Sequence, residues 1–148
     1  MSRLVLFVFS LAVLLAAVGC QRQPPYRLAP VSGTVTQGGK PLAGVIVVFW
    51  PDGVGPSSSA PTDSSGQFQM HTDQGEDGAV VGAHRVCVID GKALFSRVAR
   101  GNAGPKGLPK ELAAEPATAV PPRYADKRET PLRAEVRAEE QVIQLEVK

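Results

Sequence analysis

The segment VSGTVTQGGKPLAGVIVVFWPDG (residues 31–53), followed after a short loop by TDSSGQFQM (residues 62–70), decides the fold. Over residues 31–36, Val and Gly alternate with Ser and Thr, which predicts a strand with one face toward a core. The Gln-Gly-Gly-Lys sequence at 37–40 then favours a tight turn, because glycine tolerates positive φ. The segment is therefore expected to open with a strand, a tight turn and a second strand.

The second and third strands are predicted from the same segment. Residues 45–50 are apolar at every position, which predicts a central strand covered on both faces. Pro51 ends this strand, because proline cannot donate to a sheet. The Asp-Ser-Ser-Gly sequence at 63–66 predicts a turn, after which Phe68 and Met70 point to the same side. This succession of short strands and turns indicates a small all-β sandwich.

The C-terminal residues repeat the strand pattern. Apolar side chains alternate with charged or polar ones over residues 132–136 and 142–147, and a polar hairpin loop is predicted between them at 137–141. With a further strand at residues 84–89, the chain has about seven strands, as a Greek-key β-sandwich does. We therefore predict an all-β fold of this architecture, preceded by a signal peptide.

These motifs resemble a known family. GTVTQGGKPLAGVIVVFWPDG (residues 33–53) and TDSSGQF (residues 62–68) are similar to sequences of the carboxypeptidase regulatory-like domain, a transthyretin-like Greek-key sandwich. PPRYAD at 121–126 and TPLRAEV at 130–136 are similar to the ending of the version found in small planctomycete envelope lipoproteins. The resemblance implies a fold and an envelope setting, but it does not imply an enzyme.

The N-terminus has the features of a lipoprotein signal peptide. A short basic start precedes an apolar run over residues 4–18, which suits a signal sequence better than a membrane span. The run leads into Ala-Ala-Val-Gly-Cys, which predicts cleavage between Gly19 and Cys20 and lipidation of the Cys20 thiol. Residues 1–19 are then the signal peptide. The alternatives are an ordinary signal peptide with an incidental cysteine, or a retained membrane helix.

The remaining chain divides into two expected parts. Residues 20–30 contain three prolines, which predicts an extended, solvated tether behind the lipidated cysteine. Residues 31–148 predict one β-sandwich domain. The formal net charge of the chain is +2, which does not suggest a nucleic-acid partner. The chain has two cysteines, and lipidation of one leaves no pair for a disulfide within the domain.

A long segment at residues 91–121 interrupts the strand pattern with four prolines and four glycines. A loop of this length without structure of its own is either functional or disordered. One interpretation is a contact arm for anionic lipid headgroups or a partner protein, and the alternative is a solvated, variable insert. The basic residues of this possible contact loop are Lys92, Arg97, Arg100, Lys106 and Lys110.

No catalytic constellation is recognisable in the sequence. Nucleophilic catalysis needs a Ser, Cys or Thr beside a base, and the chain has two histidines, His71 and His84, which we expect to be ordinary strand residues. His84 should share a face with Val86 and Val88. Cys87 is expected to be a small apolar residue on a half-buried face, with a reactive or dimer-forming thiol as the alternative.

Residues for ligand binding are also sparse. No zinc-ligand spacing occurs, and Asp73, Glu76 and Asp77 lack the register of a calcium-binding loop, so a weak Ca²⁺ site is only an alternative to a solvated loop. Carbohydrate sites usually use exposed aromatic side chains, and we expect Trp50 to lie in the core strand. No metal and no cofactor are therefore predicted.

Together these observations predict a non-enzymatic lipoprotein that is anchored in a cell-envelope membrane through Cys20 and faces the periplasm or the exterior. Its sandwich is expected to be a structural or protein-interaction module, with membrane lipid and an unidentified envelope protein as partners. The alternative is a ligand-binding module for a glycan or Ca²⁺ that uses the loops at 51–61 and 91–121.

Overall fold

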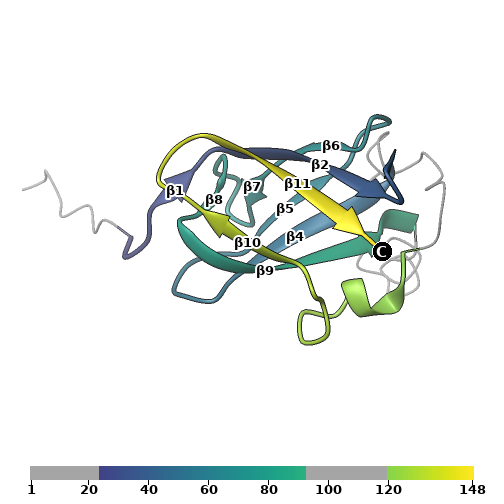
Figure 1. The fold of residues 1–148 in the computed structure, drawn as a ribbon. Helices are drawn as coiled ribbons and strands as arrows, with labels where there is room; N and C mark the ends of the chain where they lie inside the picture. The colour runs from purple at the N-terminus through teal and green to yellow at the C-terminus, as the bar shows by residue number, and fades with distance from the viewer. Residues whose placement is uncertain (1–23, 93–119) are drawn as a thin grey trace, which may run out of the picture.

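The protein is an all-β sandwich, as the sequence predicts. A computed structural model describes residues 24–92 and 120–148, and Figure 1 shows its strands in two layers. One layer is a five-stranded sheet in the order β10-β9-β4-β5-β7, and the other is a four-stranded sheet in which β2 pairs with β11, β3 and β6. A short pair, β1-β8, lies beside them. The elements are β1 (Leu28–Ala29), β2 (Val31–Gln37), β3 (Lys40–Pro41), β4 (Val45–Pro51), β5 (Ser58–Pro61), β6 (Gln67–Gln69), β7 (His71–Thr72), β8 (Ala79–Val80), β9 (Gly82–Asp90), the 3-10 turn η2 (Pro122–Tyr124), β10 (Arg133–Val136) and β11 (Gln141–Val147).

The tight turn forms where the sequence predicts it, but it leads into the two-residue β3, and the predicted second strand, β4, lies in the other sheet. In β2, Val31 and Val35 are buried while the intervening Ser and Thr residues are partly exposed. Gly38 and Gly39 adopt φ values of 57° and 77°, a left-handed conformation that other residues rarely adopt. These two glycines join β2 to β3 in antiparallel register, with Gln37 opposite Lys40.

Strand β4 is central in its sheet, but it is not covered on both faces. It pairs with β9 on one side and β5 on the other. Val45, Val47 and Phe49 are fully buried in the core, whereas the alternate residues are half-buried and Trp50 is 36% exposed. The expectation that Trp50 lies in the core is therefore wrong, because the sheet has one inner and one outer face and Trp50 falls on the outer one.

The two C-terminal strands belong to different sheets. β10 pairs antiparallel with β9, and β11 pairs parallel with β2. Residues 137–140 therefore carry the chain from one layer to the other, and the predicted hairpin is wrong, because consecutive strands of a sandwich can cross between sheets. The inner faces close on a shared core, in which the rings of Phe49 and Phe68 meet edge to face with centroids 6.4 Å apart.

Residues 120–132 are fixed to the sandwich by two hydroxyl groups. The Tyr124 hydroxyl accepts a hydrogen bond from the Lys148 backbone N–H at 2.9 Å, and the Tyr124 side chain is 2% exposed. The buried Thr130 hydroxyl donates to the Val86 carbonyl at 2.6 Å. The Tyr and Thr of this C-terminal motif thus have packing roles that join the segment to β11 and β9.

Candidate functional site

Most of the predicted site residues lie outside the described part of the chain. Lys92 is described, and its backbone N–H donates to the Asp90 carboxylate at 2.8 Å directly after β9. The lipidation and cleavage residues and the rest of the possible contact loop fall in residues 1–23 and 93–119. These residues are Gly19, Cys20, Arg97, Arg100, Lys106 and Lys110.

The described chain begins at one end of the sandwich. Leu28–Ala29 pair with β8, and Ala29 is buried, so the tether expected over residues 20–30 ends before Leu28. The β4–β5 loop lies at this same end (Figure 1). Its Val54 is 70% exposed and borders a hollow of about 500 Å³ that Tyr26 also lines. We call this the N-terminal end of the sandwich.

The long segment at 93–119 joins the sandwich at the opposite end. β9 finishes at Asp90, and the chain returns at Val120 just before η2. The C-terminus lies at this end as well (Figure 1). We call it the far end. The seven-residue strand β4 corresponds to about 23 Å, which sets the scale of the separation between the two ends.

His84 lies on the face of β9 that the sequence predicts, and this face belongs to the core. It is 1% exposed, shares the inner face with Val86 and Val88, and its ring centroid lies 5.6 Å from that of Phe49. Its Nδ1 lies 2.9 Å from the Gly82 carbonyl, and its buried Nε2 has no hydrogen-bond partner among the described residues. Burial lowers the pKa of His84, because the charged imidazolium is poorly solvated there. A neutral ring that donates from Nδ1 fits this environment.

His71 lies on the outer face of the same sheet and forms no site with His84. Its Nδ1 is 2.9 Å from the Asp77 carboxylate, and Ser59 is its partner across β5 and β7. A Ser, a His and an Asp therefore lie in a row. The imidazole is 49% exposed, and no hydrogen bond joins it to the Ser59 hydroxyl in the described part of the chain. The row is a solvated surface feature, without the nucleophile–base contact that catalysis needs.

Cys87 is more deeply buried than the sequence suggests. It is 1% exposed although it points to the outer face opposite Val48. Burial is the main cause that raises the pKa of its thiol, and the charge of Asp126 adds to it. The thiol is free, and the buried, protonated form is a poor nucleophile.

The exposed Trp50 is part of a basic surface. The Lys127 ammonium lies 4.8 Å from the centroid of its ring, within the range of a cation–π contact. Trp50 is opposite Arg85 across β4 and β9, and Arg85 is opposite Arg133 across β9 and β10. Directly opposed residues share a face. We call Trp50, Arg85, Arg133 and Lys127 the outer-face cluster. The sequence analysis missed this cluster.

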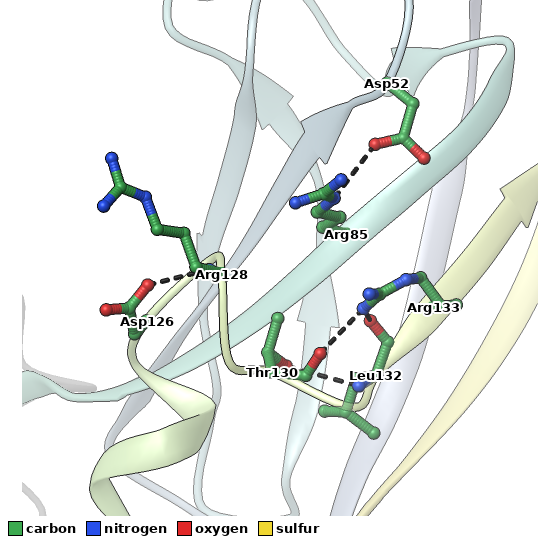
Figure 2. Close-up of polar contacts among 7 residues, drawn as sticks. All are labelled: Asp52, Arg85, Asp126, Arg128, Thr130, Leu132 and Arg133. Atoms are coloured by element: carbon green, nitrogen blue, oxygen red, sulfur yellow. Dashed lines mark hydrogen bonds and ion pairs between the residues drawn. The ribbon is translucent and has the colours of Figure 1, made fainter.

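The two arginines of the outer-face cluster are held differently (Figure 2). Arg85 Nε lies 3.2 Å from an Asp52 carboxylate oxygen, and both side chains are partly exposed. Arg133 Nη1 donates to the carbonyls of Thr130 and Leu132 at 2.7 and 2.8 Å. Among the described residues no carboxylate lies within ion-pair distance of Arg133. Its guanidinium is thus oriented by backbone carbonyls and has no direct ion-pair partner there.

Two of the three acidic residues near the β7 strand, Asp73 and Asp77, have other side-chain partners. Asp73 accepts a hydrogen bond from the Ser57 hydroxyl, and Asp77 pairs with His71. Within residues 24–92 and 120–148, no three His, Cys, Asp or Glu side chains are grouped so that they could hold a metal ion.

Comparisons with models of protein families, with curated proteins and with solved structures found no match. In the two described ranges, no helix has the length and apolar character needed to cross a membrane.

Proposed function

We propose that this protein is a lipoprotein anchored in a membrane of the cell envelope, with its β-sandwich acting as a non-enzymatic structural or protein-interaction module. The observation that carries this proposal is the Gly19–Cys20 motif behind an apolar run, a few residues before the first strand begins at Leu28. The resemblance of the following strands to carboxypeptidase regulatory-like domains supports the envelope setting.

The mechanism we propose is a short tether that limits the orientation of the sandwich. Seven residues lead from Cys20 to Arg27, whose carbonyl accepts a hydrogen bond from the Val81 N–H, and they span at most about 25 Å, so an acylated Cys20 keeps the N-terminal end close to the lipid surface. Two or more acyl chains make a stable anchor, since each buried methylene contributes about 0.8 kcal/mol. The far end, where the 93–119 segment joins the sandwich, then points away from the membrane toward other envelope components.

This orientation favours a protein partner for the 91–121 segment over the lipid headgroups of the protein's own membrane. Both ends of that segment join the sandwich about one strand length from the N-terminal end. The proposed contact residues remain Lys92, Arg97, Arg100, Lys106 and Lys110, and the proposed partner is an envelope protein with an acidic surface.

The proposal of a non-enzymatic role is supported by the placement of the histidines. His84 lies in the core and His71 on the outer face of the same sheet. The alternative of a Ca²⁺-binding module has no support among the described residues, because Asp73 and Asp77 already have side-chain partners. The alternative of a glycan-binding module has a candidate contact residue in the exposed Trp50.

Metabolic labelling with an alkyne fatty acid tests the anchor. We expect the wild-type protein and a Cys87→Ser variant to carry the label and to sediment with membranes, whereas Cys20→Ser loses both properties. Cys87→Ser is the matched control, since it removes the other cysteine of the chain. A Cys20→Ser protein that still carries the label would overturn the proposal.

In-cell crosslinking tests the contact segment. The variant replaces Lys92, Arg97, Arg100, Lys106 and Lys110 by Gln, and the matched control replaces Lys40, Arg27 and Arg137, which lie elsewhere on the surface. We expect one envelope protein to be captured by the wild type and the control but not by the variant. Equal capture of the envelope protein by the wild type, the variant and the control would show that the basic residues of the segment do not make the contact.

A further inference from the structure

The outer-face cluster combines an exposed aromatic ring with three cationic side chains. Trp50, Arg85 and Arg133 form one row across β4, β9 and β10. Neighbouring strands are 4.7–4.9 Å apart, so the row is about 10 Å long. Its residues are at least partly exposed, and the inner faces of the same strands already fill the core.

Two arginines that face each other across a strand pair are unfavourable without an anion, because like charges directly opposite repel. Asp52 offsets the charge of Arg85. Arg133 has no ion-pair partner among the described residues, although the exposed Glu135 lies two positions along on the same face of β10, and its two hydrogen bonds run from Nη1 to backbone carbonyls. A fixed cation beside a second arginine is therefore ready to receive an anion from outside the chain.

The geometry of Arg133 favours a particular type of anion. A guanidinium has five N–H donors, of which Nη1 supplies the two already used. The remaining donors are on Nε and Nη2, the edge that binds a carboxylate or phosphate with two parallel hydrogen bonds. Because Thr130 and Leu132 orient the group beforehand, binding loses little side-chain freedom.

Trp50 supplies the second half of a recognition surface. Its indole is 36% exposed at one end of the row. An exposed tryptophan offers a large, rigid apolar face that loses little entropy on binding, and sugar rings present matching apolar faces. Lys127 lies over the ring, but its side chain is exposed and flexible, so it can move aside and pair with the same anion.

We propose that the outer-face cluster binds an acidic glycan, with a sugar ring on Trp50 and the carboxylate or phosphate of the glycan on Arg133. Arg85 and Lys127 add positive charge around the anion. The site lies on the outer face of the five-stranded sheet and is independent of lipidation, so the failure of either proposal leaves the other intact.

The single tryptophan of the chain makes the test direct, because the intrinsic fluorescence reports on Trp50 alone. The full chain, purified in detergent, is titrated with galacturonic acid trimer, glucose 6-phosphate, maltotriose and inorganic phosphate. We expect a saturable change with the trimer or the sugar phosphate, and the stronger of the two identifies the anion. Maltotriose and inorganic phosphate are expected to bind at least about tenfold more weakly, because each lacks one half of the recognition chemistry.

Single-residue variants distinguish specific binding at this site from non-specific electrostatic binding of polyanions. Arg133→Gln is expected to weaken binding about tenfold or more, whereas the matched control Arg137→Gln, an exposed arginine in the β10–β11 connection, leaves it unchanged. Trp50→Phe is followed by calorimetry and is expected to weaken binding as well. Circular dichroism confirms that each variant is folded.

Three results would overturn the proposal. The first is no fluorescence change with either acidic sugar, and the second is equal binding of inorganic phosphate or maltotriose. The third is a fluorescence change that depends on protein concentration without any sugar, which would identify a second copy of the chain as the occupant of this face.

Discussion

The outer faces of the two sheets differ in composition although both cover the same core. The outer face of the five-stranded sheet carries the exposed Trp50 with Arg85, Arg133 and Lys127. The outer face of the four-stranded sheet is lined mainly by small or uncharged polar side chains. These are Ser32, Thr34 and Thr36 of β2, Gln67 and Gln69 of β6, and Gln144 of β11. The 72% exposed Val142 and the charged Glu146, both on β11, lie on the same face.

This difference shows which residues the fold leaves free. Ser and Thr on an exposed strand face are ordinary choices that satisfy strand propensity and solubility. Two directly opposed arginines are a less favourable choice, since like charges across a strand pair destabilise it. The outer face of the five-stranded sheet is therefore where binding is most reasonably sought, and the other outer face serves as its internal control.

The largest expected effect separates the inner and outer faces of one strand. Phe49→Ala should cost about 3–5 kcal/mol of unfolding free energy, because it opens a cavity in the core. Trp50→Ala should cost less than about 2 kcal/mol, because its partly exposed ring is not part of the core cluster. Urea unfolding of both variants measures the difference, and equal losses would contradict the assignment of the two faces.

A matched pair of Thr→Val substitutions compares the two sheets. Thr130→Val removes a buried hydroxyl that donates to the Val86 carbonyl at 2.6 Å, and it should cost about 1–3 kcal/mol. Thr34→Val, on the outer face of the four-stranded sheet, should change stability by less than about 0.5 kcal/mol.

Thermal unfolding measures both Thr→Val variants. Because Thr130 holds the segment that carries Lys127, Thr130→Val should also change Trp50 fluorescence, and Thr34→Val should not. Similar losses in the two variants would mean that Thr130 does not fix the segment.

The buried His84 should make stability depend on pH. Its pKa in the folded protein lies below the ordinary value of 6.5, mainly because of burial, although the Gly82 carbonyl, Asp52 and Glu135 act in the opposite direction. As pH falls below 6.5, the unfolded chain binds a proton before the folded one, so stability decreases. Above that value this contribution is fully present.

Denaturation midpoints measured between about pH 5.5 and 7.5 test the role of His84, since this range spans the ordinary titration of histidine. His84→Gln should flatten the profile, and the exposed His71→Gln should retain the dependence that His84 causes. A profile that His84→Gln leaves unchanged would exclude His84 as its cause.

The smallest effect concerns Cys87. Its thiol should resist iodoacetamide in the folded protein at pH 8 and react only after unfolding, because burial raises its pKa and blocks access. The Cys20→Ser chain isolates this thiol, since no other cysteine is then present. Rapid labelling of the folded chain would show that the outer face opens over Cys87.

The sequence by itself determined the all-β class, the Gly38–Gly39 turn and the inner positions of β2 and β11. Local rules are sufficient there, because strand alternation and positive φ at glycine depend on neighbouring residues only. The inward direction of His84 followed from the same alternation. The proposed lipidation at Cys20 also rests on sequence alone.

Only the tertiary structure decided what the second face of β4 contacts, which strand β11 joins and which arginines meet. A fully apolar strand has the same pattern whether one or both faces are covered, so the sequence placed Trp50 in the core. Arg85 and Arg133 are 48 positions apart in the chain, and their opposition arises from the register of β9 with β10. Register between distant strands is a property of the packed sheets, which no local sequence pattern encodes.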